Sequence, residues 1–104
     1  MPGSSVSPDT GLPVYSLFVG SKNGDAWRSS ERDAVFAEAS RLFDSFTMTE
    51  GTGSFRRRFV PTLVIRLGTN EEQTVLELAR ILGRLTGQEE IGLELMGRFH
   101  SIKV

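Results

Sequence analysis

The chain has 104 residues, and its 12 basic and 13 acidic side chains leave a net charge of −1 at pH 7. That length fits one domain with one hydrophobic core. The absence of cysteine excludes disulfides and thiolate metal sites, and a single histidine excludes a multi-histidine metal centre. The near-neutral balance argues against a strongly basic nucleic-acid-binding protein. We therefore expect no metal ion and no cofactor.

Residues 1–13, MPGSSVSPDTGLP, carry three of the four prolines together with several serines and glycines. This composition predicts a flexible N-terminal leader in front of a single domain of residues 14–104. The leader lacks the charged start and the apolar run of a signal peptide. No apolar stretch approaches the roughly 20 residues that a membrane span requires. We expect a cytoplasmic protein without membrane contact.

A strand, a helix and a second strand are predicted in the first half of the chain. Residues 14–20, VYSLFVG, are β-branched and aromatic and end on glycine, which is typical of a buried strand. Ser29 or Ser30 can cap a helix. Its apolar residues recur at helical spacing on one face: Val35, Phe36, Ala39, Leu42 and Phe43. Residues 46–50 alternate as a second strand.

The second half of the chain repeats this order. Residues 59–67 predict a more apolar strand. Thr69 with Glu72 three residues later matches a capping box, which opens a helix with one apolar stripe and Gly87 as its C-cap. Residues 91–95 predict the fourth strand. The segment 98–104 either extends that strand past a bulge or forms a short fifth strand.

The resulting order is β-α-β-β-α-β, which predicts a ferredoxin-like α+β sandwich. Its four-stranded antiparallel sheet would carry both helices on one face. In that topology the first and third strands are central, and the second and fourth lie at the edges. An edge strand has unpaired main-chain groups that can bond to a second subunit. We therefore expect a homo-oligomer, and specifically a dimer.

The segment 49–59, TEGTGSFRRRF, is the most distinctive stretch of the sequence. It lies between two predicted strands, whereas a phosphate-binding P-loop needs a strand before it and a helix after it. Its two glycines are therefore predicted to be turn residues that tolerate positive φ. Arg56, Arg57 and Arg58, beside Phe55, form a local positive patch. Either this patch is only solvated charge, or it contacts an acidic partner or an anionic ligand.

The loop 20–28, GSKNGDAWR, invites a second functional reading. Gly20, Gly24, Trp27 and Arg28 resemble in their spacing the phosphate loop of acylphosphatases. Backbone N–H groups at a helix start bind oxyanions, and Arg28 would supply a fixed charge. The second predicted strand lacks the asparagine that this family uses. Trp27 is predicted either to cover the core or to stack on a ligand.

Leu17-Phe18-Val19-Gly20 resembles the first strand of RNA-recognition motifs, but the third predicted strand has one aromatic residue, no glycine and a proline. An RNA-binding role is therefore not expected.

From Tyr15 to Val104 the chain resembles an uncharacterised group of small bacterial and phage proteins. The segments that carry this resemblance are 17–20 (LFVG), 46–55 (FTMTEGTGSF), 61–62 (PT) and 87–89 (GQE). Phe55 stands where the group prefers tryptophan, and Val60 stands where it prefers glutamate. Because the group has no established activity, the resemblance implies a shared fold and no particular function.

We thus predict a non-catalytic binding protein that acts as a homo-oligomer through the hairpin arginines. A phage or mobile-element origin would suit an inhibitor or a ligand-sequestering protein. The alternative is a small acylphosphatase-like hydrolase that uses the loop from Gly20 to Arg28.

Overall fold

A computed structural model describes residues 11–104. The predicted leader, 1–13, therefore lies outside the described residues except for 11–13. The helices and strands are β1 (Val14–Gly20), α1 (Ser29–Leu42), β2 (Thr47–Phe55), β3 (Arg58–Gly68), α2 (Glu72–Thr86), β4 (Glu90–Leu95) and β5 (Arg98–Lys103), with a 3-10 turn at Lys22–Gly24. The strands form one sheet in the order β2-β3-β1-β4-β5, and every neighbouring pair is antiparallel.

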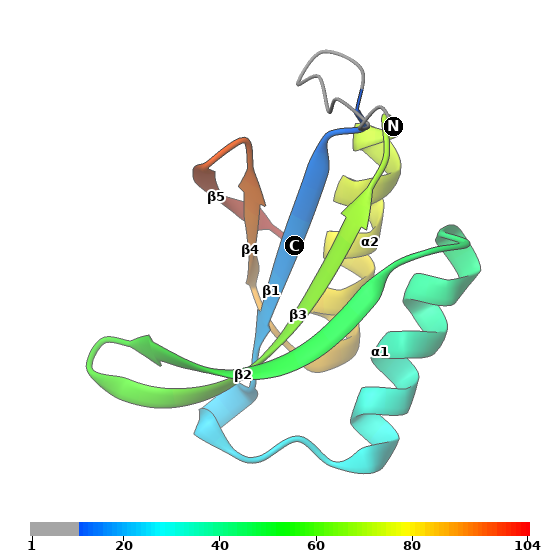
Figure 1. The fold of residues 1–104 in the computed structure, drawn as a ribbon. Coiled ribbons are helices and arrows are strands. Elements are labelled where there is room, and N and C mark those ends of the chain that lie inside the picture. The colour runs from blue at the N-terminus through cyan, green and yellow to red at the C-terminus, as the bar shows by residue number, and fades with distance from the viewer. Residues whose placement is uncertain (1–10) are drawn as a thin grey trace, which may run out of the picture.

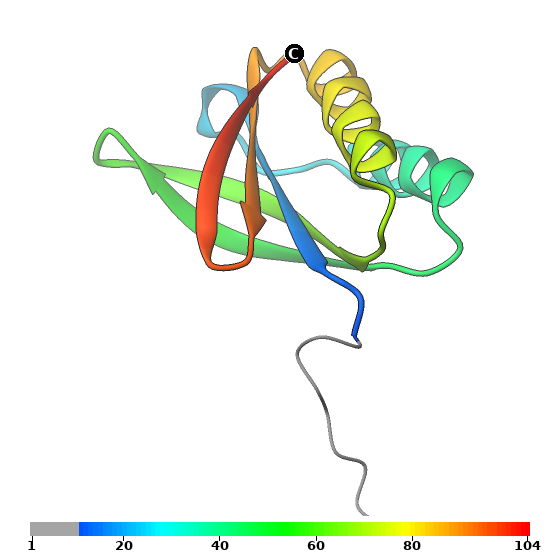
Figure 2. The ribbon, with the colours of Figure 1, turned by 90° about the horizontal axis from the view of Figure 1, so that it is seen from above.

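Both helices cover the same face of this sheet, as Figures 1 and 2 show. The predicted α+β class with two helices on one face is confirmed. Strand side chains alternate between the faces, so Leu17 and Val19 lie fully buried under the helices while Phe18 between them lies on the open face. Within residues 11–104, no helix is long and apolar enough to cross a membrane.

Helix α2 follows its sequence pattern most closely. Its buried stripe consists of Val75, Leu78, Ala79, Leu82 and Gly83. Gly87 ends the helix with φ 72°, so the predicted left-handed C-cap is confirmed.

The start of α2 differs from the predicted capping box. The N-cap is Glu71, and the Thr69 hydroxyl accepts a hydrogen bond from the Glu71 N–H at 3.0 Å. Thr69 therefore stabilises the turn before the helix and does not cap the helix itself.

Helix α1 begins at Ser29, one of the two serines that were predicted to cap it. Ser29 is its first residue and Arg28 is its N-cap. The Arg28 backbone N–H donates to Glu31 Oε1 at 2.8 Å, which gives this exposed donor a partner at the helix start. The predicted caps, Ser29 and Ser30, both lie inside the helix.

The hairpin between β2 and β3 is longer than predicted, and its glycines serve a different purpose. Strand β2 runs to Phe55, and Arg56 and Arg57 form a two-residue turn with φ values of 51° and 65°. Gly51 and Gly53 lie within β2 and have no positive φ, so the prediction that they form the turn was wrong. At Gly53 an added Cβ would lie 2.8 Å from the Thr62 side chain of β3, so close cross-strand contact explains this glycine.

At the far edge of the sheet, the second of the two alternatives for the segment 98–104 is confirmed, and the predicted edge position of the fourth strand was wrong. Residues 98–103 form a separate fifth strand that pairs with β4 along its whole length. Strand β4 is therefore not an edge strand, because the two-residue turn at Met96-Gly97 folds β5 back over it. The other predicted edge, β2, is exposed on its outer side.

Candidate functional site

The tip of the β2–β3 hairpin gathers four of the six predicted binding residues. Figure 1 shows the hairpin extending from the body of the sheet, away from both helices. Phe55 and Arg58 face each other across its last pair, with Arg56 and Arg57 in the turn. The Phe55 side chain is 65% exposed, and Arg56 Cζ lies 5.2 Å from the centre of its ring. This distance is within the range of a cation–π contact.

Within residues 11–104, the arginines at this tip take part in no ion pair. Among residues 11–104 the ion pairs are Arg32 with Glu50 and Arg41 with Glu38. The guanidinium groups of Arg56, Arg57 and Arg58 therefore keep their donors free for another molecule. Because a guanidinium presents its donors in a planar fork, it suits carboxylate or phosphate oxygens.

Phe59 adds an exposed aromatic ring that the sequence analysis did not assign to this site. It is 64% exposed and follows Arg58 along β3. Consecutive strand residues face opposite sides, so Phe55 and Phe59 lie on opposite faces of the hairpin. The sequence does show a phenylalanine on each side of the three arginines. Only the hairpin geometry shows that both phenylalanine rings are exposed.

Trp27 and Arg28, the two other predicted residues, do not join the tip. Trp27 is only 6% exposed, and its indole N–H donates to the Pro61 carbonyl at 3.2 Å. It therefore covers the core, and its ring is not presented for stacking on a ligand. The Arg28 side chain is exposed at the start of α1.

The loop from Gly20 to Arg28 is closed against β3. The Ser21 N–H donates to the Pro61 carbonyl at 2.8 Å, and the Ser21 hydroxyl donates to the Asp25 carbonyl. The Gly24 N–H donates to the Ser21 carbonyl at 3.5 Å. Two of the amides that would have to bind a phosphate are thus already used within the fold.

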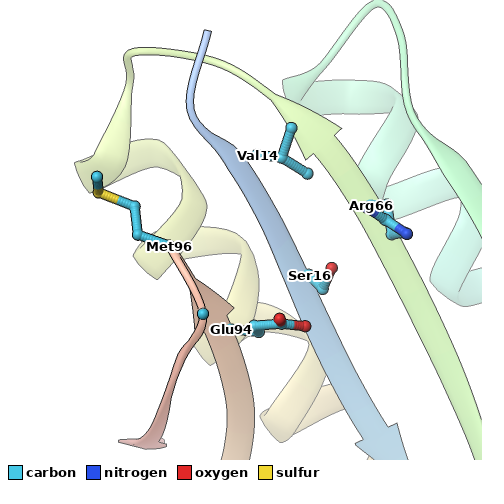
Figure 3. Close-up of a pocket in the computed structure, with 6 residues that line it drawn as sticks. Val14, Ser16, Arg66, Glu94 and Met96 are labelled. Atoms are coloured by element: carbon cyan, nitrogen blue, oxygen red, sulfur yellow. The ribbon is translucent and has the colours of Figure 1, made fainter. Parts of the chain in front are cut away.

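A second polar feature lies on the open face of the sheet, opposite the face that α1 and α2 cover. A shallow basin of about 250 Å³ is lined by Val14, Ser16, Arg66, Glu94, Met96 and Gly97. Ser16 on β1 pairs with Arg66 of β3 on one side and with Glu94 of β4 on the other. Figure 3 shows these residues across the three strands. Two strand spacings, about 10 Å, separate the two charged residues.

The basin was not found in the sequence because its residues come from three separate strands. Arg66 and Glu94 become neighbours of Ser16 only when β3 and β4 pair with β1. The two charges form no ion pair with each other in the described part of the chain. Residues 11–104 also contain no cluster of three histidine or acidic residues that could hold a metal ion.

Comparison with known proteins yields one informative likeness. No family model matches the chain, and no curated protein matches its sequence. A solved structure of a phage SAM lyase in the apo state is similar to this fold, with a TM-score of 0.58 and 16% sequence identity. The likeness covers 98% of this chain and 97% of the lyase chain. At this identity the similarity shows the shared fold.

Proposed function

We propose that this protein is a small binding protein that acts as a homo-oligomer and contacts an acidic partner or an anionic ligand through Arg56, Arg57 and Arg58. The observation that carries this proposal is the conformation of the turn. Arg56 and Arg57 both hold positive φ, a conformation that costs a non-glycine residue free energy. Asn-Gly would form such a turn at lower cost. Backbone strain at two unpaired cations is a reason to assign them a binding role.

The chemistry of the tip defines the ligand class. Three free guanidinium groups beside an exposed phenyl ring suit clustered carboxylates, sulfates or phosphates. The site is open to solvent, so binding should weaken as salt rises. We also propose that the fold is a ferredoxin-like sandwich to which β5 is added at one edge. The protein in this proposal is cytoplasmic. The likeness to a phage protein is compatible with the group of bacterial and phage proteins that the sequence resembles, and with an inhibitory or sequestering role.

Heparin, a densely sulfated polymer, is a suitable first probe for this tip. Reversing Arg56, Arg57 and Arg58 to glutamate should lower the salt concentration at which the protein leaves a heparin column. The matched control reverses Arg80, Arg84 and Arg98, which are exposed elsewhere on the fold and give the same change in net charge. Circular dichroism verifies that both variants fold. Equal elution of the two variants would show that the tip has no special role in anion binding.

A second candidate function is binding or cleavage of S-adenosylmethionine. It is favoured by the likeness to a SAM lyase over nearly the whole of both chains. The basin adds a chemical reason, because the amino-acid end of that molecule carries a carboxylate and an ammonium group. Arg66 and Glu94, on opposite sides of Ser16, could accept these two charges.

Calorimetry with S-adenosylmethionine tests this second candidate directly. Arg66→Ala and Glu94→Gln should each weaken binding at least tenfold, and chromatography of the incubated mixture detects cleavage. Thr49→Ala, which pairs with Val64 on the open face and does not line the basin, is the control. The absence of heat with the wild-type protein at millimolar ligand would reject this candidate.

The acylphosphatase-like alternative has weaker geometric support, because the loop amides of Ser21 and Gly24 already have partners. It predicts that the protein hydrolyses acetyl phosphate and that Arg28→Ala abolishes the activity. Wild-type protein without hydrolysis would exclude it.

A further inference from the structure

The two edge strands of the sheet differ in how well charged side chains protect them against pairing with another chain. Strand β5 carries Arg98 and Lys103, and charges of this kind prevent an edge from pairing with another chain. Strand β2 has nine residues, of which Glu50 is the only charged one, and Glu50 already pairs with Arg32. Its outer side therefore presents a long row of main-chain groups with little to repel a second strand.

The turn determines which main-chain groups of β2 point outward. In a two-residue turn, Phe55 and Arg58 form a hydrogen-bonded pair. Hydrogen-bonded and non-hydrogen-bonded pairs alternate along an antiparallel ladder. The outward N–H and C=O groups therefore belong to the residues between those that bond to β3, namely Met48, Glu50, Thr52 and Ser54.

We propose that two copies of this protein pair antiparallel through their β2 strands, with the two-fold axis at Gly51. This register overlaps the whole strand with itself, because Gly51 is its midpoint. It places Met48 opposite Ser54 and Glu50 opposite Thr52 of the second copy. All outward groups then become bonded, and the two Gly51 residues form a non-hydrogen-bonded pair. The inference rests on the homo-oligomer of the proposed function. It identifies a second copy of this chain as the partner that the hairpin tip contacts.

Charge and aromatic contacts at the ends of the pairing support the same register. Beyond Phe55, the turn arginines of one copy continue past Thr47 of the other. There they approach Phe46 and Asp44, which follow the C-terminus of α1. A helix C-terminus and an aspartate both attract cations. Phe46 also packs against Phe36 in a tilted arrangement, with ring centres 4.9 Å apart, and Phe36 is 50% exposed. This open aromatic pair offers a face for a guanidinium group.

Cysteine cross-linking tests the register sharply, because the chain has no cysteine of its own. Cα atoms of a non-hydrogen-bonded pair lie about 4.5 Å apart, which a disulfide can bridge. An added Cβ at Gly51 meets nothing within 4 Å, so Gly51→Cys should fold. Under mild oxidation most of this variant should become a covalent dimer. The Thr47→Cys control should stay uncross-linked, because its nearest opposite residue is Phe55 and not Thr47.

A second pair of variants tests the edge without a disulfide. Proline is tolerated on an edge strand when its missing N–H faces outward. Thr52→Pro should therefore leave the fold intact and convert a dimer, at twice 11.5 kDa, into a monomer. Ser101→Pro makes the equivalent change on the outer side of β5 and should leave the dimer unchanged. Mass is measured by light scattering after gel filtration.

The possible outcomes separate this interface from the proposed function. A dimeric wild type without cross-linking at Gly51, or one that Thr52→Pro does not dissociate, overturns the interface and leaves a homo-oligomer standing. A monomeric wild type at millimolar concentration overturns both the interface and the homo-oligomer. Anion binding by the tip is decided separately by the heparin experiment.

Discussion

The single tryptophan and the single tyrosine show how much a residue's role depends on its surroundings. Trp27 precedes a helix beside a glycine loop, and that position alone leaves a core role and a ligand role open. The fold decides in favour of the core, because the Pro61 carbonyl on β3 accepts a hydrogen bond from the indole. Tyr15 is buried on the helix-covered face of β1, and burial, with a smaller contribution from Glu72, raises the pKa of its hydroxyl above 10.0.

This raised pKa predicts a loss of stability at alkaline pH. Above about pH 10 the tyrosine of the unfolded chain ionises, whereas Tyr15 in the folded chain ionises only at a higher pH. The unfolded state is then favoured, so the free energy of unfolding should fall as pH rises through the folded-state pKa. Tyr15→Phe should show a shallower fall between pH 9 and about 11 in denaturant titrations followed by circular dichroism. Parallel curves for the two proteins would contradict this assignment.

At the scale of the element, the β2–β3 hairpin combines a strained turn with a strand, β2, that two internal glycines weaken. Gly53 lies where the two strands approach closely, Gly51 has open space beside it, and the turn is formed by arginines. This arrangement is the reverse of what local propensity favours, since Asn-Gly is the preferred pair for such a turn. The departure lies at the exposed tip, where we place binding.

Replacing Arg56-Arg57 with Asn-Gly should therefore raise the free energy of unfolding by about 1 kcal/mol, because both positions then accept positive φ at lower cost. The same variant should leave a heparin column at lower salt, since two free guanidinium groups are lost. Chemical denaturation measures the first effect. An Arg56→Lys/Arg57→Lys variant keeps the charge and should gain no stability. A less stable Asn-Gly variant would show that the turn is not strained.

At the scale of the whole molecule, one face of the sheet is covered by helices and the other is open. The open face holds the Arg66–Ser16–Glu94 basin, and the β2 edge is where we place the second copy. Contact through an edge leaves the open face accessible, so pairing and ligand binding can coexist in one assembly.

If the pairing through β2 contributes to stability, the melting temperature depends on protein concentration. Mass action predicts a rise of a few degrees for each tenfold increase in wild-type concentration. The monomeric Thr52→Pro variant should melt at one temperature throughout, and Ser101→Pro should behave as the wild type does. Scanning calorimetry over a hundredfold concentration range measures this. A wild-type melting temperature independent of concentration would argue against a stabilising dimer.

The sequence by itself determined the type and order of the two helices and the first four strands, because the patterns that specify them are local. The apolar stripe of α2 and the left-handed Gly87 are clear examples, since each depends on residues within a few turns of itself. The predicted strands 14–20 and 91–95 also agree closely with β1 and β4.

Only the tertiary structure decided where β2 ends, which residues turn the hairpin and which strand lies at the far edge. Strand pairing sums hydrogen bonds and contacts between segments that are distant in the chain, so the need for Gly53 beside Thr62 cannot be read from either segment alone. The same reason explains Trp27 and the basin. A tryptophan becomes buried, and two charges come to flank one serine, only when separate strands meet.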